Sequence, residues 1–211
     1  MIRALALVLV LCASTASTAS AQRGDGVYRR FDHDLALVFG VGGAIVLADE
    51  DEGALVLDLR ARVIDAGGLV LSYRWGAESE SQIFAGFELK PFWPALFLTS
   101  SSTHREWLDL FLQSFGVELG VAMMGLGADG DNSYGLGIGV SLEVPLSLPS
   151  RTRGAFQRAA LRLAARRVDA TRSYLGTDDA RDRSEWSVLA TLQIVVGVRA
   201  NTFAEPARYR Y

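Results

Sequence analysis

Few residues of this chain have the types and spacing that catalysis requires. Its two histidines are His33 and His104. The segment Asp32-His33-Asp34 has the composition of a metal or acid–base cluster, but neighbouring side chains of a strand point to opposite faces and would separate these groups. We therefore interpret His33 as a histidine at the start of a strand. The sequence predicts no catalytic residue, no metal site and no cofactor.

Residues 1–21 have the features of a secretory signal peptide. Arg3 supplies the positive start, an apolar stretch follows, and Ala19-Ser20-Ala21 matches a cleavage site. The mature chain would begin at Gln22 without a cysteine, because Cys12 is the only one, which excludes disulfide and thiolate chemistry. With 21 basic and 24 acidic residues and no basic patch, we expect no nucleic-acid partner.

Many charged residues of the mature chain lie on one face of an alternating pattern that repeats along the sequence. Within 134–144, large apolar residues take the even positions, and Gly, Ser and Glu take the odd ones. A period of two indicates a strand between two unlike environments. Eight such strands are predicted, at 33–48, 54–64, 68–76, 82–93, 114–124, 133–147, 155–169 and 185–201. The expected fold class is all-β, an antiparallel up-and-down barrel over 33–201, with a lead-in at 22–32 and a tail at 202–211.

The connections between the strands differ at the two ends of this barrel. Longer loops at 48–53, 76–81, 127–132 and 171–184 would share one end, and turns at 65–68 and 149–154 the other. This asymmetry is typical of outer-membrane barrels, with both mature termini on the side of the short turns.

The connection 94–113 departs from that asymmetry. Thr103-His-Arg-Glu106 matches a capping box, and Trp107, Leu108, Phe111, Leu112 and Phe115 recur at helical spacing. The pattern predicts a short amphipathic helix near 103–114 at a membrane interface. The alternative extends the fifth strand back to Trp107, and the sequence leaves both open. The four-residue spacing of Arg158, Arg162 and Arg166 also suits a helix, but the hairpin count favours a strand.

The charged face is also the small face, which indicates that it points inward. Glycines share it at positions Gly40, Gly42, Gly86, Gly120, Gly135, Gly137, Gly139 and Gly197. An eight-stranded interior is just wide enough for side chains to fill, so small residues beside a few long charged ones suit it. We therefore expect Leu136, Ile138 and Val140 to face out, and Gly137 and Glu143 to face in.

Aromatic residues gather near the predicted strand ends. Trp75, Tyr134 and Trp186 belong to one rim, and Phe31, Phe92, Trp93, Phe156 and Phe203 to the other. Aromatic girdles of this kind are typical of membrane–water interfaces. The barrel is therefore predicted to be transmembrane.

The predicted interior contains a network of charged residues, with eight basic and four acidic groups. Its members are Asp58, Arg60, Arg62, Arg74, Glu88, Lys90, Glu118, Glu143, Arg158, Arg162, Arg166 and Arg199. Because buried charges must be paired or hydrated, we expect arginine–carboxylate pairs with arginine in excess. The network is interpreted as a structural plug; the alternative is a narrow, anion-preferring path.

In these features the chain resembles the small eight-stranded outer-membrane proteins of the OmpA and OmpX architecture. It shares with them the leader, the strand number, the loop asymmetry and the charged interior, over nearly all of the mature chain. The resemblance is architectural and rests on no family motif. Such barrels commonly end on an aromatic residue in the last strand, whereas Phe203 and Tyr211 both follow it here, so the assembly signal is open between them.

These observations predict a non-enzymatic integral protein of a Gram-negative-type outer membrane, with a structural, adhesive or envelope-integrity role. Its expected partners are outer-membrane lipid, lipopolysaccharide and the barrel assembly machinery. The alternatives are the narrow channel, a soluble periplasmic ligand-binding barrel and a lipid-modifying barrel enzyme. The enzyme is disfavoured because neither histidine lies near the outer rim.

Overall fold

The computed structural model describes residues 35–47, 51–63, 65–76, 81–92, 103, 105–125, 133–152, 155–171 and 183–198. The predicted signal peptide, lead-in and tail lie outside these residues, as do His33, His104, Arg199, Phe203 and Tyr211. So do most residues of the predicted long loops.

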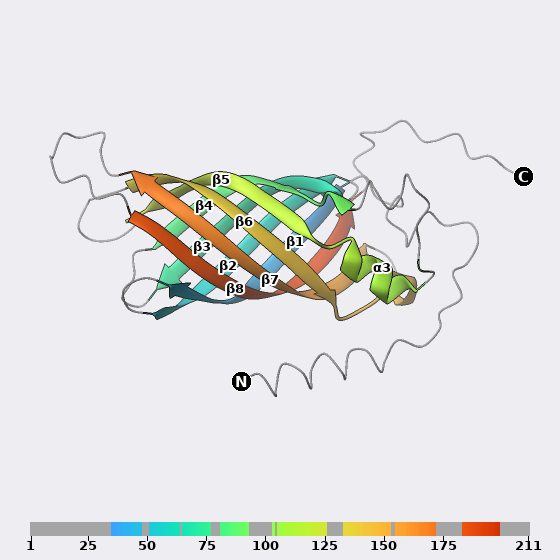
Figure 1. Ribbon diagram of the computed structural model, residues 1–211. Helices are drawn as coiled ribbons and strands as arrows, with labels where there is room; N and C mark the ends of the chain where they lie inside the picture. Colours follow the sequence, from blue (N-terminus) through green and yellow to red (C-terminus); the bar gives the residue numbers. More distant parts are fainter. Residues whose placement is uncertain are drawn as a thin grey trace, which may run out of the picture.

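Eight antiparallel strands close into one up-and-down barrel, which confirms the predicted all-β fold (Figure 1). The strands are β1 (Leu35–Leu47), β2 (Glu52–Val63), β3 (Gly67–Gly76), β4 (Gln82–Leu89), β5 (Gly116–Met124), β6 (Ser133–Pro145), β7 (Phe156–Thr171) and β8 (Arg183–Val198). The largest difference from prediction is at the end of β4, which stops at Leu89 because Pro91 has no N–H to continue the ladder.

Each strand pairs with its neighbours in the chain, and β8 pairs with β1. The β1–β2, β3–β4, β5–β6 and β7–β8 connections therefore share one end of the barrel, called the loop end below. The other three connections share the turn end. Following the pairing once round from Leu35 returns to β1 at Ile45, ten residues further along. This stagger tilts the strands by roughly 40° and leaves a narrow interior.

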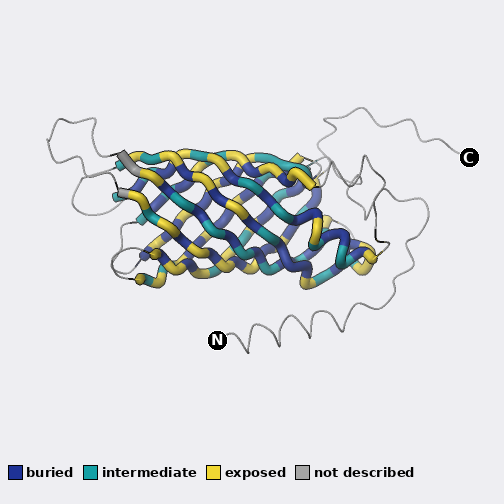
Figure 2. Tube along the Cα trace, viewed as in Figure 1, coloured by how far each residue is buried: buried dark blue, intermediate teal, exposed yellow. Residues whose placement is uncertain are grey.

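Side chains alternate between an exposed outer face and a buried inner face on every strand (Figure 2). On β6, Leu136, Ile138 and Val140 are exposed, whereas Gly137 and Glu143 are buried, as the alternation predicts. β7 is a strand throughout, which confirms the strand prediction for the Ala- and Arg-rich segment.

The helix α3 (Glu106–Leu112) lies between β4 and β5. It packs against the turn end of β6, where it covers the outward-facing Val144. The structure therefore has a helix where the sequence left helix and strand open. No helix in the described part of the chain is long and apolar enough to cross a bilayer.

The predicted capping box at the start of α3 is wrong. The N-cap is Arg105, without a side-chain cap, and not Thr103. Thr103 instead bonds to Asp109, with 2.6 Å between Thr103 Oγ1 and Asp109 Oδ1. Glu106 accepts hydrogen bonds from Ser150 in the β6–β7 connection. Thr103 is thus bonded to a side chain of the helix itself and Glu106 to the β6–β7 connection, which takes both side chains away from the local cap.

Candidate functional site

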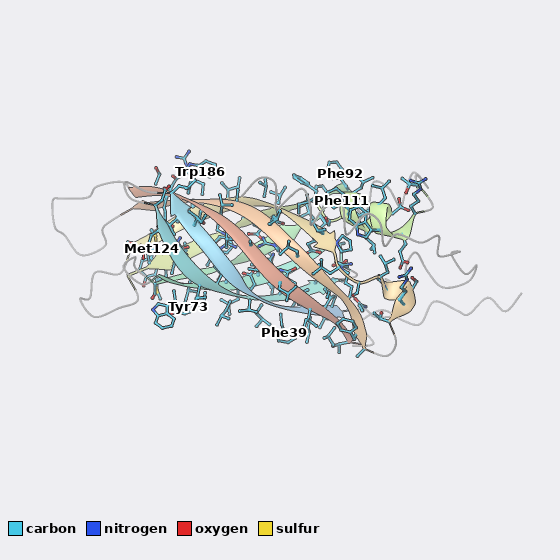
Figure 3. The ribbon with its side chains drawn as sticks, turned by 90° about the horizontal axis from the view of Figure 1, so that it is seen from below. Phe39, Tyr73, Phe92, Phe111, Met124 and Trp186 are labelled. Atoms are coloured by element: carbon cyan, nitrogen blue, oxygen red, sulfur yellow. The ribbon has the colours of Figure 1, made fainter. Side chains whose placement is uncertain are left out.

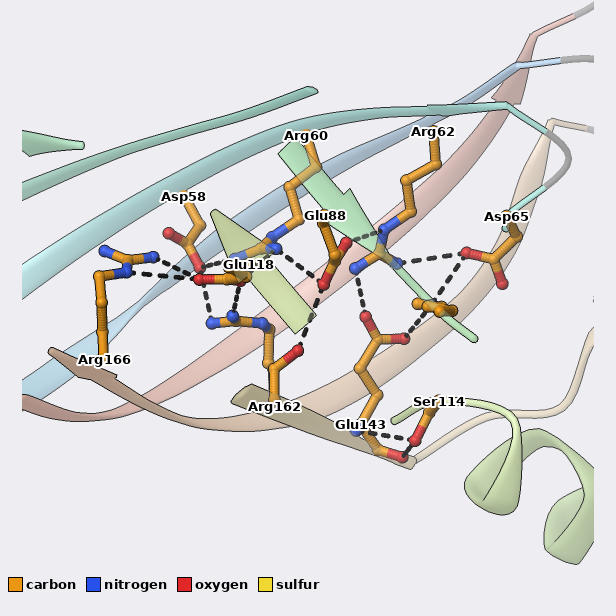
Figure 4. A network of polar contacts seen from close by, with 12 residues as sticks. Asp58, Arg60, Arg62, Asp65, Glu88, Ser114, Glu118, Glu143, Arg162 and Arg166 are labelled. Atoms are coloured by element: carbon orange, nitrogen blue, oxygen red, sulfur yellow. Dashed lines mark hydrogen bonds and ion pairs between the residues drawn. The ribbon is translucent and has the colours of Figure 1, made fainter. Parts of the chain in front are cut away.

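The interior of the barrel contains a continuous network of ion pairs (Figure 4). Eleven of the twelve charged residues predicted to line the lumen are described, and all eleven are buried. Ten of them belong to this network, and Arg74 pairs separately with Glu185 near the loop end. Arg199 lies outside the described residues.

The part of the network further from the turn end is centred on Glu118 of β5. Its carboxylate accepts hydrogen bonds from Arg60 of β2, at 2.8 Å, and from Arg162 and Arg166 of β7. Asp58 adds a second carboxylate, 3.1 Å from Arg60 and 3.4 Å from Arg162. Since these strands lie on different sides of the barrel, the pairs cross the lumen and join its walls.

Glu88 and Glu143 extend the network towards the turn end. Glu88 Oε1 lies 2.9 Å from Arg60, and its Oε2 accepts from Arg62 Nε at 2.7 Å. Glu143 pairs with Arg62, and its other oxygen lies 3.1 Å from Lys90 Nζ and 2.8 Å from Arg158. Each of these carboxylates therefore faces at least two cations.

Sequence reasoning missed two acidic members of the interior. Asp65, read only as a turn residue, pairs with Lys90 at 3.1 Å and with Arg158 at 2.8 Å. Its backbone is left-handed, with φ of 56°, which turns the side chain inward after β2 ends. Glu185 begins the strand predicted at 185–201 but was not included among the lumen residues, although the alternation of β8 puts it on the same face as Ser187 and Leu189.

These two acids nearly balance the charge of the interior. The continuous network consists of six basic groups and five acidic ones, and the Arg74–Glu185 pair is neutral. The large excess of arginine expected from the sequence is therefore reduced to one positive charge among the described residues.

Lys90 is the one network cation that is not an arginine, and it lies just past the end of β4. Burial lowers the pKa of Lys90, and the nearby positive charge of Arg62 acts in the same direction. The carboxylates of Asp65 and Glu143 oppose this change.

The interior of the barrel is not polar throughout. Two apolar clusters fill the half nearer the loop end. The first cluster consists of Val70, Phe84, Ala122, Met124 and Val168. The second consists of Ala44, Val56, Ala164 and Leu189. Val56 and Val168 of these clusters are the register neighbours of Arg74 and Glu185. A third, smaller cluster of Ala36, Val38 and Val195 lies nearer the turn end.

Phe84 joins the apolar layer to the ionic network. The guanidinium carbon of Arg166 lies 3.9 Å from the centre of its ring, a cation–π arrangement. Gly120 and Gly137, on the two strands that follow β4, leave the space that the ring occupies. A Cβ atom added at either glycine would lie 2.7 Å from a ring carbon.

The arrangement is suited to holding the barrel walls together. Its charges are committed to one another, and among the described residues no group of histidine, cysteine or acidic side chains could hold a metal ion. Comparisons with protein-family models, with curated proteins and with solved structures found no match to this chain. The class of the protein is therefore defined by its fold, a closed eight-stranded antiparallel barrel.

Proposed function

We propose that the chain is a non-enzymatic integral protein of an outer membrane, with a structural, adhesive or envelope-integrity role. The observation that carries this proposal is the inversion of the barrel, which buries ion pairs and exposes large apolar side chains on every strand. A water-soluble barrel has the opposite distribution, because its exterior must be hydrated. Figure 3 shows these side chains around the outside of the barrel.

The height of the apolar band supports a membrane setting. On β8, exposed apolar residues run from Trp186 to Val198. At a rise of about 3.3 Å per residue and a tilt of roughly 40°, this run covers about 30 Å along the barrel axis. The hydrocarbon core of a bilayer has a similar thickness of about 30 Å.

Polar and aromatic residues at the loop end fit the upper boundary of such a band. The exposed rings of Tyr134 and Trp186 lie near that rim. Next to them, Arg167 and Asp169 form an exposed ion pair at 2.9 Å, and the guanidinium carbon of Arg167 lies 5.8 Å from the Trp186 ring. Amphipathic rings and ion pairs of this kind are stable at headgroup depth.

The packed interior favours a structural role over the narrow channel. Phe84, Leu189 and Val168 are buried in the lumen, where a path for ions would have to run. The small net charge of the network also weakens the argument for an anion preference. The same filling favours a structural role over a soluble ligand-binding barrel, which needs interior space.

The proposed setting is the outer membrane of a Gram-negative-type bacterium, with both mature termini in the periplasm. It rests on the predicted leader together with the apolar outer face. The corresponding partners are outer-membrane lipid, lipopolysaccharide and the barrel assembly machinery. The architectural resemblance to OmpA and OmpX belongs to the same proposal.

The test is expression of the full chain in a Gram-negative host, followed by membrane fractionation and electrophoresis with and without boiling. We expect recovery in the outer-membrane fraction, and a band whose migration changes on heating. Recovery as a soluble periplasmic monomer would refute the proposal.

A further inference from the structure

Helix α3 is amphipathic, but the face that it buries is mostly polar. Glu106, Asp109 and Leu110 are buried, as is the C-cap residue Gln113, at spacings that place them on one side of the helix. Glu106 accepts from the backbone N–H of Ser150 at 3.0 Å, and Asp109 from that of Thr103 at 2.9 Å. The buried face of α3 therefore combines hydrogen-bonded polar side chains with the single apolar side chain of Leu110.

The other face of α3 is apolar and only partly covered by the rest of the protein. It consists of Trp107, Leu108 and Phe111, which are half-buried, and of Leu112, which is exposed. Trp107 stacks on Phe111 with 5.3 Å between ring centres, and Leu112 is 44% exposed. On the surface of a water-soluble protein, an amphipathic helix has the reverse orientation, because its apolar stripe faces the core.

The segment that includes α3 also closes a free strand edge. Pairing of β5 with β6 ends at Gly116 and Ser141, so the last residues of β6 have no partner strand on that side. Ser114 Oγ accepts from Glu143 N–H at 2.9 Å and lies 2.9 Å from the Glu143 carbonyl oxygen. Trp107 Nε1 donates to the Pro145 carbonyl at 3.0 Å. Pro145 itself has no N–H, so this edge is left without a free backbone donor.

Such a seal is needed most where water is absent. An unpaired backbone group in hydrocarbon costs several kcal/mol, whereas at a wet surface water satisfies it. The covering of Glu143 and Pro145 by side chains therefore fits a strand edge that faces lipid.

The strands next to α3 are also the shortest. The outward residues of β4 run from Ile83 to Leu89, which covers about 15 Å of height at a tilt of roughly 40°. An apolar band of about 25 Å is usual for these barrels. The shortfall of about 10 Å equals the diameter of one helix. Beyond β4, Phe92 is exposed and its ring lies 5.3 Å from that of Phe115, which continues the apolar surface towards α3.

We propose that α3 is embedded in the lipid at the turn end of the barrel, with Trp107, Phe111 and Leu112 at the boundary between acyl chains and headgroups. There it completes the apolar band beside β4 and β5 and seals the free edge of β6. The proposal rests on the proposed function, because it requires a bilayer around the barrel.

The test uses single cysteines in the mature chain, since Cys12 is the only cysteine of the sequence and lies in the predicted leader. Leu112→Cys is labelled with an environment-sensitive dye, and the protein is inserted into phosphatidylcholine vesicles. Nitroxide lipids and aqueous iodide then report the surroundings of the dye. Leu192→Cys, in the middle of the band, and Asp51→Cys, in an exposed loop, are the controls.

We expect the dye at Leu112 to be quenched several-fold more strongly by a shallow nitroxide than by iodide. The dye at Leu192 should be quenched several-fold more strongly by a deep nitroxide than by iodide. If the Leu112 dye responds to iodide like the Asp51 dye while Leu192 remains in lipid, the proposal for α3 is overturned and the proposed function stands. If both Leu112 and Leu192 respond to iodide, the proposed function itself fails.

A second variant tests the seal. Trp107→Phe keeps the stacked ring but removes the N–H that bonds to Pro145. Its urea midpoint in vesicles should fall, whereas Leu108→Phe, on the same helix face, should leave the midpoint nearly unchanged. Equal midpoints for the two variants would overturn the sealing role.

Discussion

At the scale of single residues, the barrel is held by carboxylates that each bind several cations. Glu118 is the clearest case, because Arg60, Arg162 and Arg166 all converge on it. Alternation along the strands predicts which charged residues point inward. It does not predict that Arg62 of β2 meets Glu143 of β6, because partners across a lumen depend on the height that each residue reaches in a tilted barrel.

Replacing Glu118 by glutamine should destabilise the protein strongly. The change leaves three buried guanidinium groups without their shared carboxylate, and breaking a buried pair in this way costs about 3–5 kcal/mol. The free energy of unfolding in urea, measured in detergent micelles, reports this loss. The control is Asp169→Asn, whose exposed ion pair with Arg167 should contribute less than about 1 kcal/mol. Equal losses in the two variants would show that the network does not stabilise the fold.

Gly137→Ala should also destabilise the barrel, through the Phe84 ring. The new Cβ would lie 2.7 Å from Phe84 Cε2, so the ring must move within a packed layer, at a cost of about 1–3 kcal/mol. Phe84→Leu in the same chain should recover part of the loss, as a double-mutant cycle of urea midpoints would detect. Gly53→Ala is the matched control, because no atom lies within 4 Å of its added Cβ. An unchanged midpoint for Gly137→Ala would contradict the packing described for Phe84.

At the scale of elements, the strands could be predicted from sequence, and the helix only in part. Hydrophobic alternation gave the eight strands and their inner faces, since both depend on local order along the chain. The cap of α3 could not be predicted, because the fold brings Ser150 to Glu106, and Thr103 bonds to the Asp109 side chain. The apolar layer around Phe84 was missed for a related reason. An inward-facing aromatic looks anomalous until the glycines of two other strands are known to face it.

The outer face of each strand should tolerate charge only near its ends. Leu192 and Trp186 lie on the same strand with nearly equal exposure, 50% and 48%. In a bilayer, Leu192→Arg should cost about 2–4 kcal/mol, and Trp186→Arg, near the interface, about 0–1 kcal/mol beyond the loss of the ring. Unfolding in urea from lipid vesicles measures both. Similar, small effects at the two positions would be expected of a surface in water.

At the scale of the whole molecule, the interior consists of layers. The Arg74–Glu185 pair and two apolar clusters occupy the half nearer the loop end, and the ionic network occupies the half nearer the turns beside a smaller apolar cluster of Ala36, Val38 and Val195. The layers explain why one narrow lumen tolerates so many buried charges: each charge is paired, and the network as a whole is nearly neutral.

This layered interior should not conduct ions. Purified protein in a planar bilayer is expected to give no current steps above the background of protein-free detergent at low or high salt. Discrete anion-selective steps would assign the protein to the narrow channel instead. A Phe84→Ala variant tests the cause, because steps that appear only in this variant would identify the apolar layer as the barrier.

The central claim is that the barrel is inside out, with its apolar face in lipid. Single spin labels placed in turn at 136–141 on β6, in protein reconstituted into vesicles, measure it most directly through their accessibility to oxygen and to a water-soluble nickel complex. We expect a period of two, with Leu136, Ile138 and Val140 accessible to oxygen and shielded from nickel. High nickel accessibility at these three positions would contradict it.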